Sequence, residues 1–362
     1  MRNRLWLFSA FFLWAFALVQ PSTTYYRSPS LRAPALNPAG GGDEHTIQDD
    51  HGQPMSVVSL VDADGIPYWY YRIFTPVCLT GECRPVDIGI YWHFSGKYLG
   101  IDVYREPLTK TDHSEFTPMD YDRLESILRN ERSDLREYTP EELVEPVEKP
   151  STGTAMDGIT GATRKAVSEA AVKDAVFTTH TIWHLIHVGE PEQLALLALS
   201  EMSHNPDLIH RLLASADTEN RDFVLRGVID GHLQADSAIE NTILQGLDAA
   251  DHAFRSLSFN ALSRLDLSAE TLQETLATSY PRLKTDEKIK LLSALDHTPL
   301  NTALRTAFIN EFTSDTQPWL LIKILSLFKQ PEVPLNDREK RAITKLKTDH
   351  VALKRALAEM SK

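Results

Sequence analysis

The sequence predicts an α+β N-terminal domain, made of an antiparallel sheet and helices, followed by an all-α solenoid of short helical repeats. Between residues 45 and 105, apolar and polar side chains alternate with the period of two that is typical of strands. Beyond residue 190 no strand pattern occurs, and amphipathic helical patterns follow one another. A chain of 362 residues is also longer than the chains that usually fold around a single hydrophobic core. We therefore expect two folded domains, over 45–189 and 190–362.

The composition is that of a globular protein with an acidic balance. Apolar residues make up 42% of the chain and charged residues 24%. The net charge of −13 argues against nucleic acid as a partner, because neutralising phosphates requires a basic surface. The sequence contains neither G-x-G-x-x-G nor a Walker lysine motif, and no Ser-His-Asp order can be assigned. Nothing therefore indicates a dehydrogenase or a kinase.

The first residues have the pattern of an export signal. A basic start, MRNR, precedes the uncharged apolar run Leu5–Val19, whose fifteen residues fall short of the roughly 17–25 needed to cross a bilayer. Ala15 and Ala17 are small residues suited to cleavage. We predict a signal peptide over 1–20, with an uncleaved anchor as the alternative. Residues 21–44 are rich in Pro, Ser and Gly and are predicted to be a flexible tether. The folded part is expected to be periplasmic, or extracytoplasmic and membrane-associated.

Four strand candidates follow the tether, over residues 55–61, 68–77, 87–94 and 98–104. Turn-forming DADGIP separates the first two candidates, and SGK separates the last two. In the third candidate, alternation places four apolar side chains on one face: Ile88, Ile90, Trp92 and Phe94. The opposite face carries Asp87, Gly89, Tyr91 and His93. This pattern predicts an antiparallel sheet that is aromatic on at least one face.

The chain contains two cysteines, Cys78 and Cys83. In an exported protein two nearby cysteines most simply form a disulfide, and Gly81 between them permits the necessary turn. Arg84 stands where a haem-attachment motif requires a histidine. A structural disulfide is the favoured interpretation, and a redox-active pair is the alternative.

Helical patterns begin after Pro107. Thr117 and Pro118 mark a helix start, and Asn205, Ser268 and Thr285 are typical starts among the later helices. These later segments span roughly 12–16 residues each, and their pair spacing near 30–40 residues is typical of HEAT-like α-solenoids. Such surfaces usually bind partners, so we expect this half to dock a redox partner or a membrane protein.

A short motif, DGITGAT at residues 157–163, lies just before a predicted long helix over 164–187. The pattern Asp-x-x-Ser/Thr-Gly-Ala-Thr resembles the flavinylation motif of the FMN-binding domain family. That family includes the flavin-carrying subunits of sodium-pumping NADH:quinone reductase and the Rnf complex. The resemblance covers roughly residues 45–189. It implies that an FMN transferase links the FMN phosphate by a phosphoester to the last threonine of the motif. The matching residues are Asp157, Thr160, Gly161, Ala162 and Thr163, with Thr163 as the acceptor.

These residue types suit the implied attachment. Thr163 supplies the hydroxyl, and Gly161 and Ala162 leave room for close approach of the phosphate. A helix that starts here directs free N–H groups towards the phosphodiester. The resemblance implies that Asp157 orients the donor or a bound cation. The alternative interpretation is that Thr163 simply caps the helix.

The chain departs from the family at two places. Arg164, Lys165 and Ala166 follow the acceptor, where the family usually has a small hydroxyl residue two positions on. Glu106 and Thr109 correspond only loosely to the Glu-Thr-Pro-Gly-like segment that helps to seat the flavin ring. A degenerate domain without flavin, in a non-catalytic extracytoplasmic scaffold protein, is therefore the alternative function.

Three histidines, His180, His184 and His187, share one face of the predicted helix. A packing role is the favoured interpretation, and weak metal binding or an electron- or proton-handling role are the alternatives. His180 comes seventeen residues after Thr163, or about 25 Å along a continuous helix, which is too far to touch a ring held near the helix start. His113 is expected to lie nearer the motif than these three histidines, but the favoured interpretation is that it is an ordinary loop residue.

The sequence thus predicts an exported electron-transfer flavoprotein with covalent FMN at Thr163 and a helical-repeat docking domain. Its expected partners are an FMN transferase during maturation and an unidentified redox partner. In this interpretation the chain is an electron carrier or a component of a redox system rather than a stand-alone enzyme.

Overall fold

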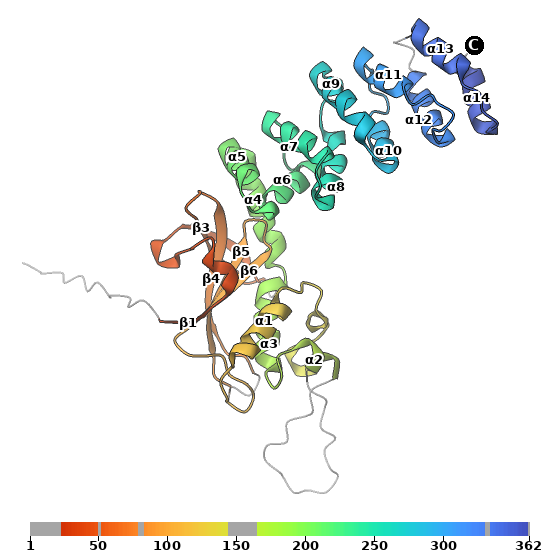
Figure 1. The fold of residues 1–362 in the computed structure, drawn as a ribbon. Helices are drawn as coiled ribbons and strands as arrows, with labels where there is room; N and C mark the ends of the chain where they lie inside the picture. The colour runs from red at the N-terminus through yellow and green to blue at the C-terminus, as the bar shows by residue number, and fades with distance from the viewer. Residues whose placement is uncertain (1–22, 50–51, 79–82, 144–164, 330–333, 361–362) are drawn as a thin grey trace, which may run out of the picture.

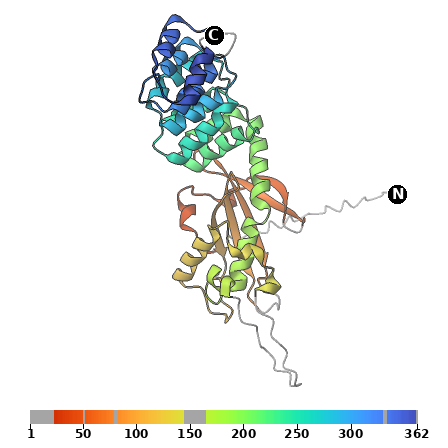
Figure 2. The same cartoon turned by 90° about the vertical axis from the view of Figure 1, so that its right-hand side faces the viewer.

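The computed structural model describes residues 23–49, 52–78, 83–143, 165–329 and 334–360 (Figure 1). The predicted signal peptide and the 157–163 motif lie outside these described residues. An antiparallel six-stranded sheet with helices is followed by a long array of helices, which confirms the predicted fold class. Figures 1 and 2 show the helical array extending from one end of the sheet.

The sheet has the strand order β1-β6-β5-β4-β3-β2, and its neighbouring strands are antiparallel. Asp62 closes the β3–β4 turn, where its side chain accepts hydrogen bonds from the N–H groups of Asp64 and Ile66. Ser95 and Gly96 form the β5–β6 turn. Both predicted turns are therefore present. The strands are β1 Thr24–Arg27, β2 Asp43–Gln48, β3 Pro54–Val61, β4 Pro67–Thr75, β5 Val86–His93 and β6 Tyr98–Tyr104.

Helices α1 (Pro118–Leu128) and α3 (Val176–His187) contact each other beside the sheet. The indole Nε1 of Trp92 donates to the Ile186 carbonyl over 3.1 Å, which ties β5 to α3. α1 starts at Pro118 behind a Thr117 cap, as predicted. Two 3₁₀ turns, Asp134–Glu137 and Pro140–Glu142, follow it.

The prediction of a flexible tether over 21–44 is wrong from residue 24 onward. β1 pairs with β6, and 3₁₀ turns at Pro29–Arg32 and Pro38–Gly40 carry the chain on to β2. Leu31 and Leu36 are 0% and 3% exposed, so they anchor this segment in the core. A Cβ at Gly100 would lie 2.9 Å from Leu31 Cγ, so the close approach requires glycine there. We call residues 28–42 the strap, because they lie against the sheet face that carries Tyr91.

The prediction of a single helix over 164–187 is also wrong. The chain forms α2 (Lys165–Ala170), then a turn, and then α3. Asp174 in the turn has a left-handed φ of 59°, which interrupts a right-handed helix. Its carbonyl accepts hydrogen bonds from the backbone N–H and the hydroxyl of Thr111, at 2.7 and 2.9 Å. The distance of about 25 Å expected between Thr163 and His180 along a continuous helix therefore does not apply.

The remaining helices form two rows. Contacts join α5, α7, α9 and α11 in one row, and α6, α8, α10, α12 and α14 in the other. Each repeat thus packs mainly on its neighbours, as in an α-solenoid. The Asn205 cap is present, whereas Ser268 precedes its helix and Thr285 is the first helical residue. The bounds are α4 Glu190–His204, α5 Pro206–Ala214, α6 Thr218–Ile229, α7 Ser237–Leu247, α8 His252–Ala261, α9 Glu270–Ser279, α10 Thr285–Ala294, α11 Thr302–Ile309, α12 Pro318–Phe328, α13 Asp337–Lys345 and α14 Val351–Met360.

Among the helices that the structure describes, none combines the length and the apolar character that a membrane span requires.

Candidate functional site

The predicted attachment motif, with Asp157, Thr160, Gly161, Ala162 and Thr163, lies outside the described residues. The chain is described again from Lys165, at the start of α2. The carbonyl of Glu169 in α2 accepts a hydrogen bond of 2.6 Å from Arg123 of α1. The structure therefore fixes α2 against α1, and the turn after α2 against the loop that contains Thr111.

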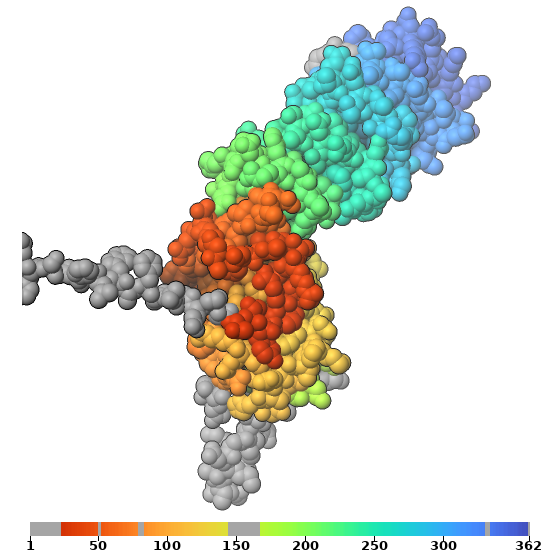
Figure 3. Space-filling model, turned by 60° about the vertical axis from the view of Figure 1, so that its left-hand side comes forward, coloured from red at the N-terminus to blue at the C-terminus, as the bar shows by residue number. Residues whose placement is uncertain are grey.

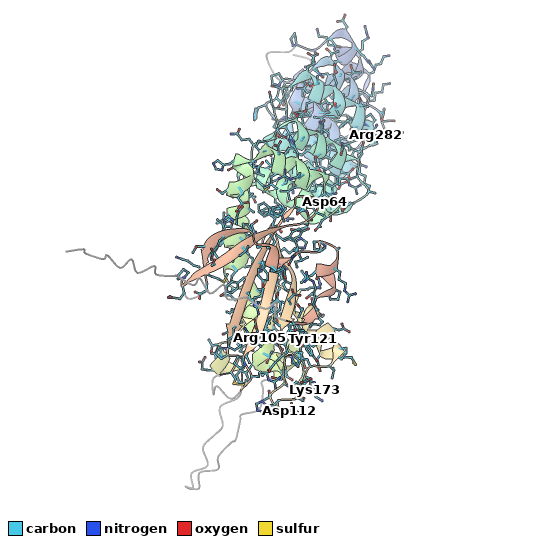
Figure 4. The ribbon with its side chains drawn as sticks, turned by 90° about the vertical axis from the view of Figure 1, so that its left-hand side faces the viewer. Asp64, Arg105, Asp112, Tyr121, Lys173 and Arg282 are labelled. Carbon is cyan, nitrogen blue, oxygen red and sulfur yellow. A yellow bond between two sulfur atoms is a disulfide. The ribbon has the colours of Figure 1, made fainter. Side chains whose placement is uncertain are left out.

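A cavity of about 240 Å³ opens at this same end of the sheet. Figure 4 shows Arg105, Asp112, Tyr121 and Lys173 together there, away from the repeats. The end of β4, the start of β5 and the segment after β6 form its walls. The lining residues are Phe74, Arg84, Pro85, Val86, Asp87, Tyr104, Arg105, Glu106, Pro107, Leu108 and Thr109.

Ion pairs organise the charged wall of this cavity. Asp87 is 7% exposed and lies between two guanidinium groups. Arg72 donates to both of its oxygens over 3.0 and 3.1 Å, and Arg105 Nε lies 2.9 Å from Oδ2. The hydrogen bonds to Asp87 raise the pKa of Arg72. Arg84 pairs with Glu106 at 3.2 Å, so three cationic groups face two carboxylates here.

A buried tyrosine cluster continues from the cavity into the sheet. Tyr91 and Tyr104 donate to Asp102 Oδ2 over 2.7 and 3.2 Å, and Tyr70 lies 3.2 Å from the Tyr104 hydroxyl. Asp102 is 1% exposed and also pairs with Arg27 at 3.2 Å. Burial raises the pKa of Asp102 and of each tyrosine. This network fixes the Tyr104 hydroxyl, and Tyr104 also lines the cavity.

Glu106 and Thr109, which the family resemblance related loosely to a ring-seating segment, both line the cavity. Thr109 is 6% exposed, and its carbonyl accepts a hydrogen bond of 3.2 Å from the Thr178 hydroxyl of α3. Arg72, Arg105 and Tyr104 are not among the site residues that the sequence predicted. The signal for them was present, because Arg72, Asp87 and Asp102 place charge on strands that are otherwise apolar and aromatic.

The three helical histidines each direct Nε2 at a backbone carbonyl between residues 128 and 138. His180, His184 and His187 donate to Tyr138, Leu135 and Leu128 over 2.7, 2.9 and 2.8 Å. Burial lowers the pKa of His180 to about 4 and also lowers that of His187. These rings therefore pack α3 onto the 128–138 segment. Within the described ranges no group of three or more His, Cys, Asp or Glu side chains is arranged to hold a metal ion.

The two cysteines form the predicted disulfide. Cys78 and Cys83 have Cα atoms 5.8 Å apart, and their bond closes the connection from β4 to β5. The neighbouring Arg84 belongs to the cavity wall. His113 lies exposed in the loop after β6, with a left-handed φ of 65°.

Comparison with known proteins gives no relative for this chain: no family model, no curated protein and no solved structure matches it. Any functional assignment must therefore come from the residues of this chain.

Proposed function

We propose that this protein is an exported electron-transfer flavoprotein, with FMN linked through its phosphate to the Thr163 hydroxyl. The observation that carries this proposal is the segment Asp157-x-x-Thr160-Gly161-Ala162-Thr163, which resembles a flavinylation motif over its full length. The disulfide is compatible with an oxidising, extracytoplasmic location. The helical repeats would then dock the redox partner.

The cavity at the end of β4, β5 and β6 offers groups that suit a flavin ring. Arg84 and Arg105 provide guanidinium donors for ring carbonyl and nitrogen acceptors, and Phe74 and Tyr104 provide flat apolar surfaces. Its volume of about 240 Å³ lies below the roughly 300–1,000 Å³ of pockets that enclose a whole ligand. The cavity therefore suits one edge of a ring and leaves the remainder accessible to a partner.

The proposed roles of the chain are attachment, orientation and charge compensation. A bound flavin supplies the exchange of electrons itself. Arg105, held in place by Asp87, would place positive charge beside the ring and favour the negative charge that reduction adds. Glu106 and Thr109 would shape the wall between that charge and α3.

Flavin attachment can be tested by expressing the chain in an exporting host together with an FMN transferase. We expect the purified protein to show flavin absorbance that survives denaturation, because the link is covalent. Thr163→Ala should abolish the absorbance, whereas Thr154→Ala, outside the motif, should retain it. A colourless wild-type protein under these conditions contradicts the proposal and favours a non-catalytic extracytoplasmic scaffold.

A further inference from the structure

The disulfide between Cys78 and Cys83 adds little to the stability of the sheet. β4 and β5 are already paired from Tyr68 with His93 to Thr75 with Val86. The disulfide joins positions only five apart in sequence, and cross-links that close short loops stabilise less than those that close long ones. Stabilisation of the β4–β5 pair therefore does not explain the disulfide.

Both cysteines are half-buried, in contrast to the buried residues Val77 and Val86 nearby. The carbonyl of Val77 accepts a hydrogen bond from the Thr181 hydroxyl of α3. This contact fixes the chain next to Cys78, which is itself only half-buried.

The two sulfur atoms have different surroundings. The backbone N–H of Cys83 donates to Cys78 Sγ over 3.0 Å. Once the disulfide is opened, that N–H stabilises negative charge on Cys78, because a thiolate is a stronger acceptor than a thiol. A stabilised thiolate is both the better leaving group and the more populated nucleophile. Arg84 adds a weaker positive field, since it is paired with Glu106.

We propose that Cys78 and Cys83 form a reversible redox site that oxidises a small dithiol. One thiolate of the dithiol attacks Cys83 Sγ, the Cys78–Cys83 bond breaks, and Cys78 leaves as a thiolate held by the Cys83 N–H. The second thiolate of the dithiol then attacks the substrate sulfur of the mixed disulfide and releases Cys83. Two electrons pass from the dithiol to the protein, and the two protons end on the cysteines or in solvent. The site does not depend on flavin.

The redox equilibrium of the full chain tests this directly. The chain has only these two cysteines, so every thiol that is counted comes from this pair. Structural disulfides resist the cytosolic glutathione pool, whereas catalytic ones exchange with it. In a glutathione buffer at the cytosolic redox potential, we expect the disulfide to be reduced in more than half of the protein molecules. Thiol labelling after acid quenching measures this fraction. A pair that stays oxidised in this buffer overturns the proposal. Thr163→Ala should give the same equilibrium as wild type, which separates this result from the fate of the flavin.

Single-cysteine variants test the difference between the two sulfurs. Cys83→Ser keeps the backbone N–H that faces Cys78, so its thiol should react with iodoacetamide at neutral pH roughly tenfold faster than that of Cys78→Ser. Equal rates, or a faster Cys83, contradict the assigned roles. Far-ultraviolet circular dichroism on both variants establishes that the compared chains are folded.

Discussion

Two buried carboxylates of the sheet domain are held by specific partners. Asp102 is enclosed by Arg27, Tyr91 and Tyr104, and Asp87 by two arginines. A buried carboxylate without such partners would be strongly disfavoured. The histidines of α3 follow the same rule, since each donates a hydrogen bond from Nε2 to a backbone carbonyl. Side chains at these positions therefore determine how the loops around α3 are fixed.

We expect the stability of the fold to fall as the pH drops from about 6.5 to about 4, in part through His180. Burial lowers its pKa to about 4, so in this range the folded protein binds fewer protons than the unfolded chain. The loss amounts to up to about 3 kcal/mol at the acidic end. Urea unfolding at several pH values measures it.

His180→Gln should flatten this pH dependence, because glutamine can donate to the Tyr138 carbonyl but does not titrate. His232→Gln, at an exposed position, provides the matched control and should leave the slope unchanged. An unaltered slope in His180→Gln would show that protonation of His180 does not destabilise the fold.

Alternation in the sequence was sufficient to predict the central strands, because Ile88, Ile90 and Trp92 recur with a period of two. The strap and the break before α3 were not predictable from local sequence. The strap is rich in Pro, Ser and Gly, and it is held by the buried Leu36 and by the buried Leu31, which lies beside Gly100 far along the chain. The turn before α3 contains neither Gly nor Pro, and it depends on long-range hydrogen bonds from Thr111.

The strap can be tested by Leu31→Ala. Leu31 is 0% exposed, so its truncation should lower the free energy of unfolding by about 2–5 kcal/mol. Chemical denaturation measures the change, and Leu196→Ala, at a position that is 56% exposed, is the control with little expected effect. A flexible tether over these residues would instead predict equal stability for both variants.

The whole molecule is an elongated body in which the repeats continue from the sheet domain (Figure 3). Glu219 of α6 accepts from Ser95 over 3.0 Å and pairs with Lys97 at 3.3 Å. Gln193 of α4 and Gln48 of β2 exchange two hydrogen bonds, of 2.9 and 2.7 Å. These polar contacts could not be read from the sequence, because they depend on how two separately predicted domains meet.

Gly96→Ala should weaken this junction. Gly96 has a φ of 82°, and a Cβ there would clash with the Pro191 carbonyl of α4. Strain and overpacking together should cost about 2–4 kcal/mol. We expect the sheet and the repeats to unfold in separate transitions in this variant, followed by tyrosine fluorescence and by helical circular dichroism.

Gly52→Ala isolates the contribution of backbone strain. Gly52 has a similar φ of 73° but no atoms within 4 Å of the added Cβ. It should lose only about 1–2 kcal/mol and keep the unfolding behaviour of the wild type. If the two variants behave alike, the Gly96 contact does not couple the domains.

Attachment of FMN to Thr163 is the central functional claim, and peptide mass mapping tests it most directly. Trypsin should release the motif in the peptide 137–164, because it cleaves after Arg136 and after Arg164. Lys149, between them, precedes a proline and resists cleavage. For protein exported together with an FMN transferase, we predict that this peptide gains the mass of FMN less one water, and that fragmentation places the gain on Thr163. An unmodified peptide, or a flavin on a different residue, would contradict the account.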